Sequence, residues 1–309
     1  MTELMEVKFN KEIQNSIKQL IDEKKLNLST IAKGVNKSPS TLSLYISGKY
    51  TGDVVALEDD LKNYLSLFSK KENTENKTLD FVETTIAKRL FHAANMCQLK
   101  GKMGVCYGTP GIGKTTAINE YKKTSSGVIV VDPFEQSSAR EVLKQIANHL
   151  KLSYLNNTSL DEFTSNVIKK LEKNKYIIII DEAENLKIEV FKTIRKIHDR
   201  TKNNCGVLFV GTDELRALLQ KVQSGFPYIS SRIGYLEKLD ALKMNDIEKL
   251  VHQYFPSCND RLVQYIAIST NYNARSIQNL LDLCFDFVKS ENIELDIDVI
   301  DAAREKLLI

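Results

Sequence analysis

The sequence predicts an α/β fold: a parallel five-stranded sheet with helices on both faces and a helical lid, preceded by an all-α domain. Five short apolar runs alternate with helical patterns, and strands that alternate with helices form parallel sheets. Most of these runs lack the period-two alternation of half-exposed strands, so we expect burial on both faces. The predicted strands are MGVCY at 103–107, GVIVVD at 127–132, YIIIID at 176–181, CGVLFVG at 205–211 and IGYLEKL at 233–239.

The pattern divides the chain of 309 residues into four parts. Residues 1–68 show only short helical patterns, and residues 69–80 contain the wholly polar stretch KKENTENKT, which is typical of a linker. Residues 81–240 hold the strands, and residues 241–309 return to helical periodicity alone. The helices expected in the first part are Lys11–Glu23, Ser29–Val35, Pro39–Ser47 and Leu57–Phe68.

Composition excludes several classes of protein. The formal net charge is only +3, so binding to nucleic acid must depend on local basic patches. There is no run of about 18 apolar residues, which argues against a membrane span. The N-terminus lacks the apolar segment of a secretory signal. The five cysteines are scattered without a CxxC pair, which argues against a zinc site and favours reduced thiols in a cytoplasmic protein.

The most specific motif is GTPGIGKT, a Walker A loop that matches GxxxxGK[ST] between a predicted strand and a predicted helix. Its glycines let backbone N–H groups point at phosphate oxygens, and the helix N-terminus adds positive charge. Lys114 would reach the β- and γ-phosphates, and Thr115 would offer its hydroxyl to Mg²⁺. The predicted ATP-binding residues of the loop are Gly108, Thr109, Pro110, Gly111, Ile112, Gly113, Lys114, Thr115 and Thr116.

The segment IIIIDEAENL has the form of a Walker B strand. Asp181, at its end, would hold Mg²⁺ directly or through water. Glu182 would orient and polarise the attacking water, which implies hydrolysis and not only binding of the nucleotide. The alternative is an acidic turn that ends a core strand.

Three further residues are candidates for contact with the γ-phosphate. Thr212 follows the fourth strand and could contact the phosphate or the attacking water, or it could cap the next helix, or both. Arg232 precedes the last strand and could reach the γ-phosphate of a neighbouring subunit. Arg275 begins a helix near the C-terminus and could bend back over the nucleotide. For both arginines the alternative is an exposed surface side chain.

The first 68 residues contain a helix-turn-helix pattern. Ser29 is placed to cap the first helix, Asn36 suits a left-handed turn, and Ser38 with Pro39 begins the second helix. The outward side chains are mostly small hydroxyls, which suit phosphates better than base edges, so we expect weak sequence preference. The predicted DNA contacts are Lys37, Ser38, Ser40, Thr41, Ser43 and Lys49, with Arg140 and Lys144 in the strand-containing domain.

Two alternatives apply to this DNA interface. The helical domain could be an adaptor that binds protein, and the basic residues of the second domain could be an ordinary solvated helix face. The chain has no Trp and shows no pattern of aromatic residues for base stacking, which favours duplex over single-stranded DNA.

In their order along residues 81–309, these motifs resemble the AAA+ ATPases. The small first domain ending in LSLYISGKYTGD, the linker and the segment FVET at 81–84 narrow the resemblance to the phage Mu B-type transposition ATPases. The resemblance is looser to transposon ATPases that pair with DDE transposases. It implies Mg²⁺-dependent, DNA-stimulated ATP hydrolysis and self-assembly on duplex DNA as a helical filament or ring. It also implies delivery of target DNA to a DDE transposase, with stimulation of strand transfer.

Two other functions share the same core. One is a replication initiator or helicase loader, and the other is a transcription repressor with a nucleotide-sensing module. If the chain is a Mu B-type transposition ATPase, we expect a cytoplasmic, DNA-associated protein encoded by a bacterium, a phage or a mobile element, with no membrane partner.

Overall fold

The computed structural model describes residues 9–23, 26–73, 79–155, 157–201, 204–225 and 231–307. The chain divides into two compact units, Met1–Thr78 and Leu79–Ile309. Each unit has an apolar core of its own.

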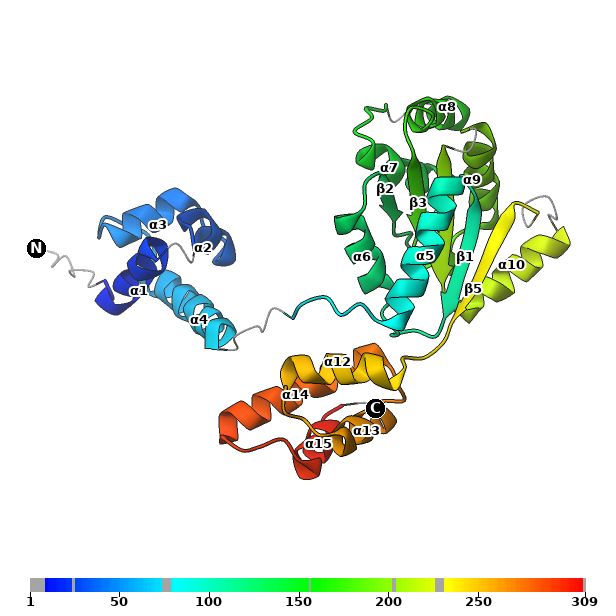
Figure 1. The fold of residues 1–309 in the computed structure, drawn as a ribbon. Helices are drawn as coiled ribbons and strands as arrows, with labels where there is room; N and C mark the ends of the chain where they lie inside the picture. Colours follow the sequence, from blue (N-terminus) through cyan, green and yellow to red (C-terminus); the bar gives the residue numbers. More distant parts are fainter. Residues whose placement is uncertain are drawn as a thin grey trace, which may run out of the picture. The chain divides into compact units, whose positions relative to one another are not determined.

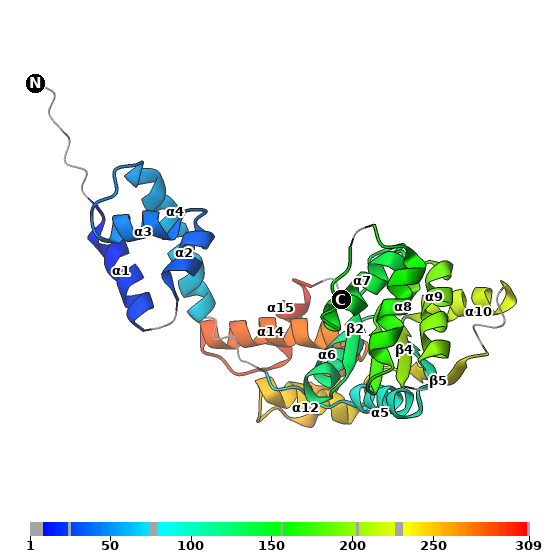
Figure 2. The same ribbon diagram turned by 90° about the horizontal axis from the view of Figure 1, so that it is seen from above.

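The described part of the first unit is all-helical (Figure 2). Its core is a single apolar cluster in which Ile17, Ile31, Leu42, Leu57 and Leu61 are buried. The helices are α1 (Lys11–Asp22), α2 (Leu28–Gly34), α3 (Pro39–Ile46) and α4 (Val54–Asn73).

The turn between α2 and α3 forms largely as the sequence predicts. Asn36 has a φ of 52°, and Ser38 accepts a hydrogen bond from the Thr41 N–H at 3.1 Å, which begins α3 at Pro39. The predicted cap at Ser29 is wrong. Asn27 caps α2 instead, because its Oδ1 accepts the Thr30 N–H at 2.8 Å and so starts the helix one residue earlier.

The last helix of this unit is longer than predicted. α4 continues to Asn73 and takes in the first residues of the stretch expected to be a linker, residues 69–73. Lys and Glu are good helix formers and need no buried face to extend an existing helix. Residues 74–78, the middle of the predicted linker, lie outside the described residues.

The second unit contains a parallel sheet whose five strands lie in the order β2-β3-β4-β1-β5. The five predicted strands are confirmed, with ends that differ by one residue at most. The strands are β1 (Met103–Gly108), β2 (Val128–Val131), β3 (Tyr176–Ile180), β4 (Cys205–Gly211) and β5 (Ile233–Leu239).

Helices cover both faces of this sheet (Figure 1). In β3, Ile177 and Ile179 pack in the cluster that contains α5 and α6, whereas Ile178 and Ile180 pack with α7, α8 and α9. Successive side chains of a strand point to opposite faces, so a continuous apolar run indicates a strand covered on both sides. The helices are α5 (Thr85–Lys100), α6 (Lys114–Thr124), α7 (Ala139–His149), α8 (Leu160–Leu171), α9 (Ile188–Arg200) and α10 (Asp213–Gly225).

The strand β5 is an exception to this burial pattern. Its residues alternate between half-buried and exposed positions up to the buried Leu239, and Leu236 is 59% exposed. The reason is its place at the edge of the sheet, where it pairs only with β1.

A lid of four helices follows β5, and its apolar core is continuous with that of α5 and α6. Asp246, which is buried, accepts hydrogen bonds from the N–H groups of Thr85 at 2.8 Å and Lys243 at 3.2 Å. This carboxylate therefore fixes the start of the lid to the start of α5. The lid helices are α12 (Met244–Tyr254), α13 (Asp260–Ser269), α14 (Ala274–Glu291) and α15 (Ile297–Arg304).

Two further features concern the whole described chain. All five cysteines are free thiols, and all but Cys258 are buried. Within the described ranges, no helix combines the length and the apolar character that a membrane crossing requires.

The close approach of α5 to β4 generates a test of the fold. A Cβ at Gly206 would lie 2.3 Å from the Cys97 carbonyl oxygen and 2.9 Å from the Gln98 nitrogen. These are backbone atoms of α5 that cannot move aside as a side chain can. We expect Gly206→Ala to destabilise the protein by about 1–3 kcal/mol, the usual effect of overpacking, and to lower the thermal unfolding midpoint by several degrees.

The matched control is Gly234→Ala in β5, where the nearest atom to a new Cβ is 3.4 Å away in the Lys102 side chain. Its unfolding midpoint should stay near that of the unchanged protein. Equal midpoints for the two variants would contradict the packing of α5 on β4.

Candidate functional site

The loop between β1 and α6 has the backbone that phosphate binding requires. Gly111 and Gly113 have φ values of 80° and 94°, which side chains other than glycine rarely tolerate. α6 begins at Lys114 directly after Gly113, and this N-cap residue, a glycine, makes no side-chain hydrogen bond to the first N–H groups. These N–H groups and the positive end of the helix form a site suited to an anion.

Lys114 is folded back on its own loop. Its Nζ donates hydrogen bonds to the carbonyl oxygens of Gly108 and Thr109, both at 2.8 Å. Burial lowers the pKa of the Lys114 ammonium, and the nearby carboxylates of Asp181 and Glu184 oppose this effect. The ammonium is thus held within the loop by two carbonyl groups, whose place phosphate oxygens can take.

Thr115 and Asp181 meet although 66 residues separate them in the sequence. The Thr115 hydroxyl donates to Asp181 Oδ2 at 2.6 Å, and the Glu182 N–H donates to Oδ1 at 3.0 Å. Burial raises the pKa of Asp181, and these two hydrogen bonds act against the increase. The contact joins the loop to the end of β3.

The donor atoms of this pair fit Mg²⁺, which prefers oxygen ligands and usually takes one or two carboxylates together with substrate phosphates. Among the described residues, no three or more His, Cys, Asp and Glu side chains group as a metal site. The remaining ligands would therefore be phosphate oxygens and water.

Glu182 directly precedes a short 3₁₀ turn, η1 (Ala183–Asn185). It is exposed and has a left-handed φ of 46°. Asn185, which the sequence did not single out, donates from Nδ2 to Glu182 Oε2 at 3.2 Å. The carboxylate proposed to activate water is therefore next to Asp181 and is hydrogen-bonded to its own turn.

Thr212 is joined to the same turn by Glu184, another residue that the sequence analysis missed. Glu184 Oε1 accepts the Thr212 N–H at 3.0 Å, while Oε2 is buried without a hydrogen-bond partner among the described residues. The Thr212 hydroxyl accepts the Glu214 N–H at 3.3 Å, so the helix-capping alternative is realised. Only its position inside DEAEN could have drawn attention to Glu184.

Arg275 lies where the lid meets the loop. Its side chain is exposed, and its backbone N–H donates to the Gly111 carbonyl at 3.0 Å. Asn273, two residues earlier, donates from Nδ2 to the Pro110 carbonyl at 2.7 Å. The sequence analysis found the arginine and missed the asparagine beside it.

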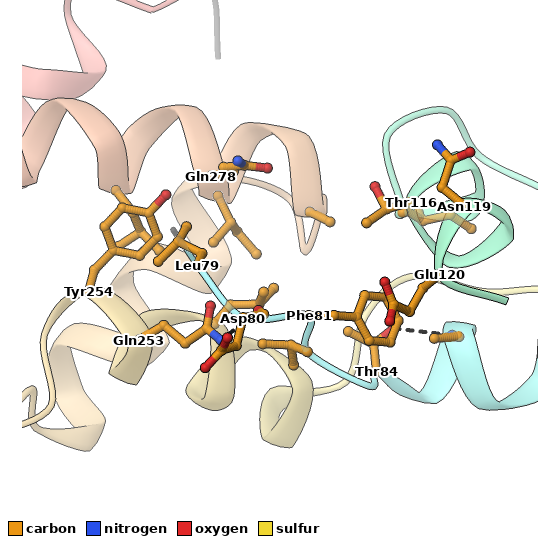
Figure 3. Close-up of a pocket in the computed structure, with 18 of the residues that line it drawn as sticks. Leu79, Asp80, Phe81, Thr84, Thr116, Asn119, Glu120, Gln253, Tyr254 and Gln278 are labelled. Carbon is orange, nitrogen blue, oxygen red and sulfur yellow. Dashed lines mark hydrogen bonds between the residues drawn. The ribbon is translucent and has the colours of Figure 1, made fainter. Parts of the chain in front are cut away.

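A pocket of about 650 Å³ adjoins the loop. Figure 3 shows side chains from three parts of the chain around it: the segment 79–84 before α5, the helix α6 and the lid. Ile112, Gly113 and Thr116 line it on the loop side. The Gln253 side chain donates to the Asp80 carbonyl at 2.7 Å and so ties α12 to the segment before α5. A group of nucleoside size fits between these elements.

Arg232 lies at the amino ends of the strands, on the side of the sheet away from the phosphate-binding loop. It directly precedes β5, whose first residue, Ile233, pairs with Met103 at the amino end of β1, whereas the phosphate loop follows the carboxyl end. Arg232 Nε donates to Asp199 Oδ1 at 2.9 Å. Although burial alone would raise the pKa of Asp199, its hydrogen bond and ion pair with Arg232 hold that pKa below its usual value.

The predicted DNA contacts lie in both units. In the first unit Lys37, Ser38, Ser40, Ser43 and Lys49 are exposed and Thr41 is half-buried. The Ser38 hydroxyl lies 2.7 Å from the Ser40 hydroxyl and 2.9 Å from that of Thr41. These three hydroxyls are therefore partly satisfied by one another.

In the second unit both predicted DNA contacts, Arg140 and Lys144, are half-buried on α7. Arg140 donates a hydrogen bond to the Thr158 carbonyl, which ties the start of α7 to the loop before α8. It therefore has a structural role, and its contact with DNA stays a prediction.

Comparison with known proteins finds similar sequences for the part of the chain that contains these residues. A family model described as AAA domain matches residues 98–219. Over 245 residues the chain is 26% identical to the ATP-dependent target DNA activator B of Escherichia phage Mu, which covers 77% of this chain and 76% of that protein. It is 25% identical over 202 residues to the Mu-like prophage FluMu DNA transposition protein B of Haemophilus influenzae, covering 65% and 69%.

Solved structures share the fold. The Cdc6p of Pyrobaculum aerophilum matches with a TM-score of 0.62 at 16% identity, over 75% of this chain and 70% of that one. The ORC2 protein of Aeropyrum pernix, solved as ADPNP–ADP complexes, matches with a TM-score of 0.59 at 18% identity, over 74% and 68%. These likenesses confirm the predicted fold class.

The buried carboxylate generates a prediction about stability. Asp181→Asn removes a charge from a site that is 5% exposed, while the amide can still accept the Glu182 N–H and donate to Thr115. In protein free of nucleotide and metal, we expect the unfolding midpoint to rise by a few degrees, or roughly 1 kcal/mol.

The control is Asp213→Asn, an exposed carboxylate in the first turn of α10, which should give no gain. A fall in the midpoint for Asp181→Asn would mean that the charged form of Asp181 is stabilised by its surroundings.

Proposed function

We propose that this chain, whose resemblance to the AAA+ ATPases of the phage Mu B type is confirmed, hydrolyses ATP, assembles on duplex DNA and delivers that DNA to a DDE transposase. The observation that carries the ATPase part is the 2.6 Å contact between Thr115 and Asp181, which unites the loop and the strand in one oxygen-lined site. The transposition part is supported by the names of the relatives, a target DNA activator and a transposition protein.

Binding begins at the loop. The phosphates of ATP accept hydrogen bonds from the N–H groups at the start of α6, and Lys114 exchanges the Gly108 and Thr109 carbonyls for phosphate oxygens. Thr115 and Asp181 would hold Mg²⁺, which would supply positive charge against the phosphates. The base occupies the pocket between residues 79–84, α6 and the lid.

Hydrolysis needs a carboxylate that can reach water. Glu182 is exposed at the edge of the site, and its tie to Asn185 is one hydrogen bond of 3.2 Å between neutral amide and carboxylate. Rotation of Glu182 away from Asn185 frees it to orient and polarise the attacking water. Thr212 supports this geometry through its backbone contact with Glu184.

Arg232 connects hydrolysis to self-assembly. Within one chain it lies at the amino ends of the strands, far from the loop at their carboxyl ends. It can act on phosphate only in a neighbouring copy, in a head-to-tail contact of the kind that builds rings or helical filaments. Arg232 must then break its hydrogen bond to Asp199, or keep it while another N–H of the guanidinium contacts the phosphate.

DNA binding rests on local charge because the net charge is small. The exposed residues of the α2–α3 pair, with Lys37 and Lys49 among them, supply phosphate contacts that carry little sequence information. Such contacts suit a protein that must accept many target sequences in the cytoplasm of its host.

A replication initiator or helicase loader would share this core. The likeness to Cdc6p and ORC2 concerns the fold, at 16–18% identity. The relatives named for transposition match 65–77% of this chain at 25–26% identity, and they favour the transposition function.

The first functional prediction concerns Glu182. Glu182→Gln leaves the loop and Asp181 intact, so it should bind ATP normally while turnover falls by roughly 10²–10⁴-fold, the scale of general-base loss. The measurement is steady-state phosphate release, with and without random-sequence duplex DNA, beside a binding titration.

The matched control is Glu189→Gln, an exposed carboxylate in the first turn of α9, which should keep full activity. Near-normal turnover in Glu182→Gln would refute the assignment. Turnover that does not respond to duplex DNA would refute the DNA-dependent part of the proposal.

The second functional prediction concerns Arg232. Arg232→Ala should bind ATP but hydrolyse it poorly, because arginines of this kind contribute about 10³–10⁵ in rate in related phosphoryl transfer. Mixing it with Lys114→Ala protein should restore part of the activity, since the second protein supplies Arg232 to an intact loop in the first. The measurement is ATPase rate on DNA against mixing ratio.

Lys238→Ala, which removes an exposed cation from β5, the strand that follows Arg232, serves as the control. Full activity of Arg232→Ala alone would place the essential arginine elsewhere. An absence of rescue in the mixture would argue that Arg232 acts within its own chain.

A further inference from the structure

The turn between α13 and α14 brings the lid onto the phosphate-binding loop. Asn273, the residue before α14, donates from Nδ2 to the Pro110 carbonyl at 2.7 Å. Beside it the Arg275 N–H donates to the Gly111 carbonyl at 3.0 Å. Two adjacent carbonyls of the loop are thus bound by two donors at the start of one lid helix.

The same asparagine caps that helix. Its Oδ1 accepts the N–H groups of Arg275 at 3.1 Å and Ser276 at 3.2 Å. The N–H groups need an acceptor and the Pro110 carbonyl needs a donor, so the network itself assigns the oxygen to α14 and the nitrogen to the loop. One side chain therefore fixes both the start of the helix and its position on the loop.

The contact depends on glycine at position 111. A Cβ there would lie 2.5 Å from Asn273 Oδ1 and 2.7 Å from Nδ2, so a larger residue would push Asn273 away. The two residues before Asn273 have left-handed backbone: φ is 50° at Asn271, which tolerates it, and 56° at Tyr272, where it is strained. Strained backbone persists only where its surroundings hold it, and the Leu242 N–H donates to the Tyr272 carbonyl at 3.3 Å.

Arg275 is the charged residue at the start of α14, beside the contact between Asn273 and the loop. Its side chain is exposed while its backbone is fixed to Gly111. Its charge adds to burial, the larger cause, in lowering the pKa of the Lys114 ammonium. The guanidinium therefore lies within electrostatic range of the lysine that serves the phosphates.

We propose that Asn273 is a positioning residue that seats α14 on the phosphate-binding loop and so directs Arg275 to the phosphates of bound nucleotide. This inference rests on the proposed nucleotide-binding function of the loop. Since Asn273 contacts the loop through Pro110 and the helix through its N–H groups, its effect on nucleotide affinity passes through Arg275.

The test separates the two contacts of Asn273. Asn273→Asp keeps the oxygen that caps α14 but loses the donor to Pro110, and Asn273→Ser keeps a capping hydroxyl too short to reach the loop. In the full-length protein, binding of a fluorescent ATP analogue should weaken about tenfold in both variants. This is the effect expected when Arg275 loses one charge-assisted hydrogen bond to the phosphates. Their thermal unfolding midpoints without nucleotide should fall by a few degrees at most, the effect of one lost hydrogen bond.

A double-mutant cycle identifies the route of the effect. Arg275→Ala should weaken binding by a similar factor, and Asn273→Asp should add nothing further in that background. Unchanged affinity in Asn273→Asp would overturn the proposal. So would an equal further loss in the Arg275→Ala background, since the asparagine would then act independently of the arginine.

Two controls complete the design. Asn259→Asp alters an asparagine that caps α13 through the Leu262 N–H, and it should bind ATP normally. Lys114→Ala should abolish binding. If Lys114→Ala abolishes binding and Asn273→Asp has no effect, only the role of Asn273 fails. If Lys114→Ala keeps full affinity, the nucleotide site itself is refuted, and this inference with it.

Discussion

All five strands of the sheet run in the same direction, so their carboxyl ends meet at one edge, and the candidate site depends on this constraint. The loop after β1, the carboxylates after β3 and the polar turn after β4 come from distant parts of the sequence but follow neighbouring or next-neighbouring strands. Open parallel sheets bind ligands at this edge because loops and helix N-termini converge there. The same constraint places Arg232, which precedes a strand, at the other edge, where it cannot serve its own loop.

Two charged groups of the site, and Arg232 at the opposite ends of the strands, already have partners within the chain. Lys114 is bound by two carbonyls of its loop, Glu182 by Asn185 and Arg232 by Asp199. Under the proposed function, binding of nucleotide at this site would exchange these hydrogen bonds for others. An exchange costs less than leaving a buried charge unpaired, so the folded chain can be stable before its ligand arrives.

The strands and the loop could be predicted because their causes are local. Four consecutive isoleucines before Asp181 indicate a strand covered on both faces, and the glycine spacing around Lys114 indicates a left-handed turn before a helix. The contacts of Glu184 and Asn273 could not be predicted, because their partners lie 28 and 163 residues away. The limits of α2 and α4 also escaped prediction: Asn27 competes with Ser29 as a cap, and helix-forming polar residues carry α4 to Asn73.

The separation of the phosphate loop and Arg232 on opposite edges of one sheet has a consequence for any assembly of these chains. A row of copies joined loop to arginine has two unlike ends, so it has polarity even on DNA of symmetric sequence. The copy at one end presents a loop that no arginine completes, and the copy at the other end presents an arginine with no loop to serve. Such a row would keep its ATP longest at the first of these ends. The nucleotide state of each copy would then differ along the row, so that it distinguishes the two ends and the older copies from the newer ones.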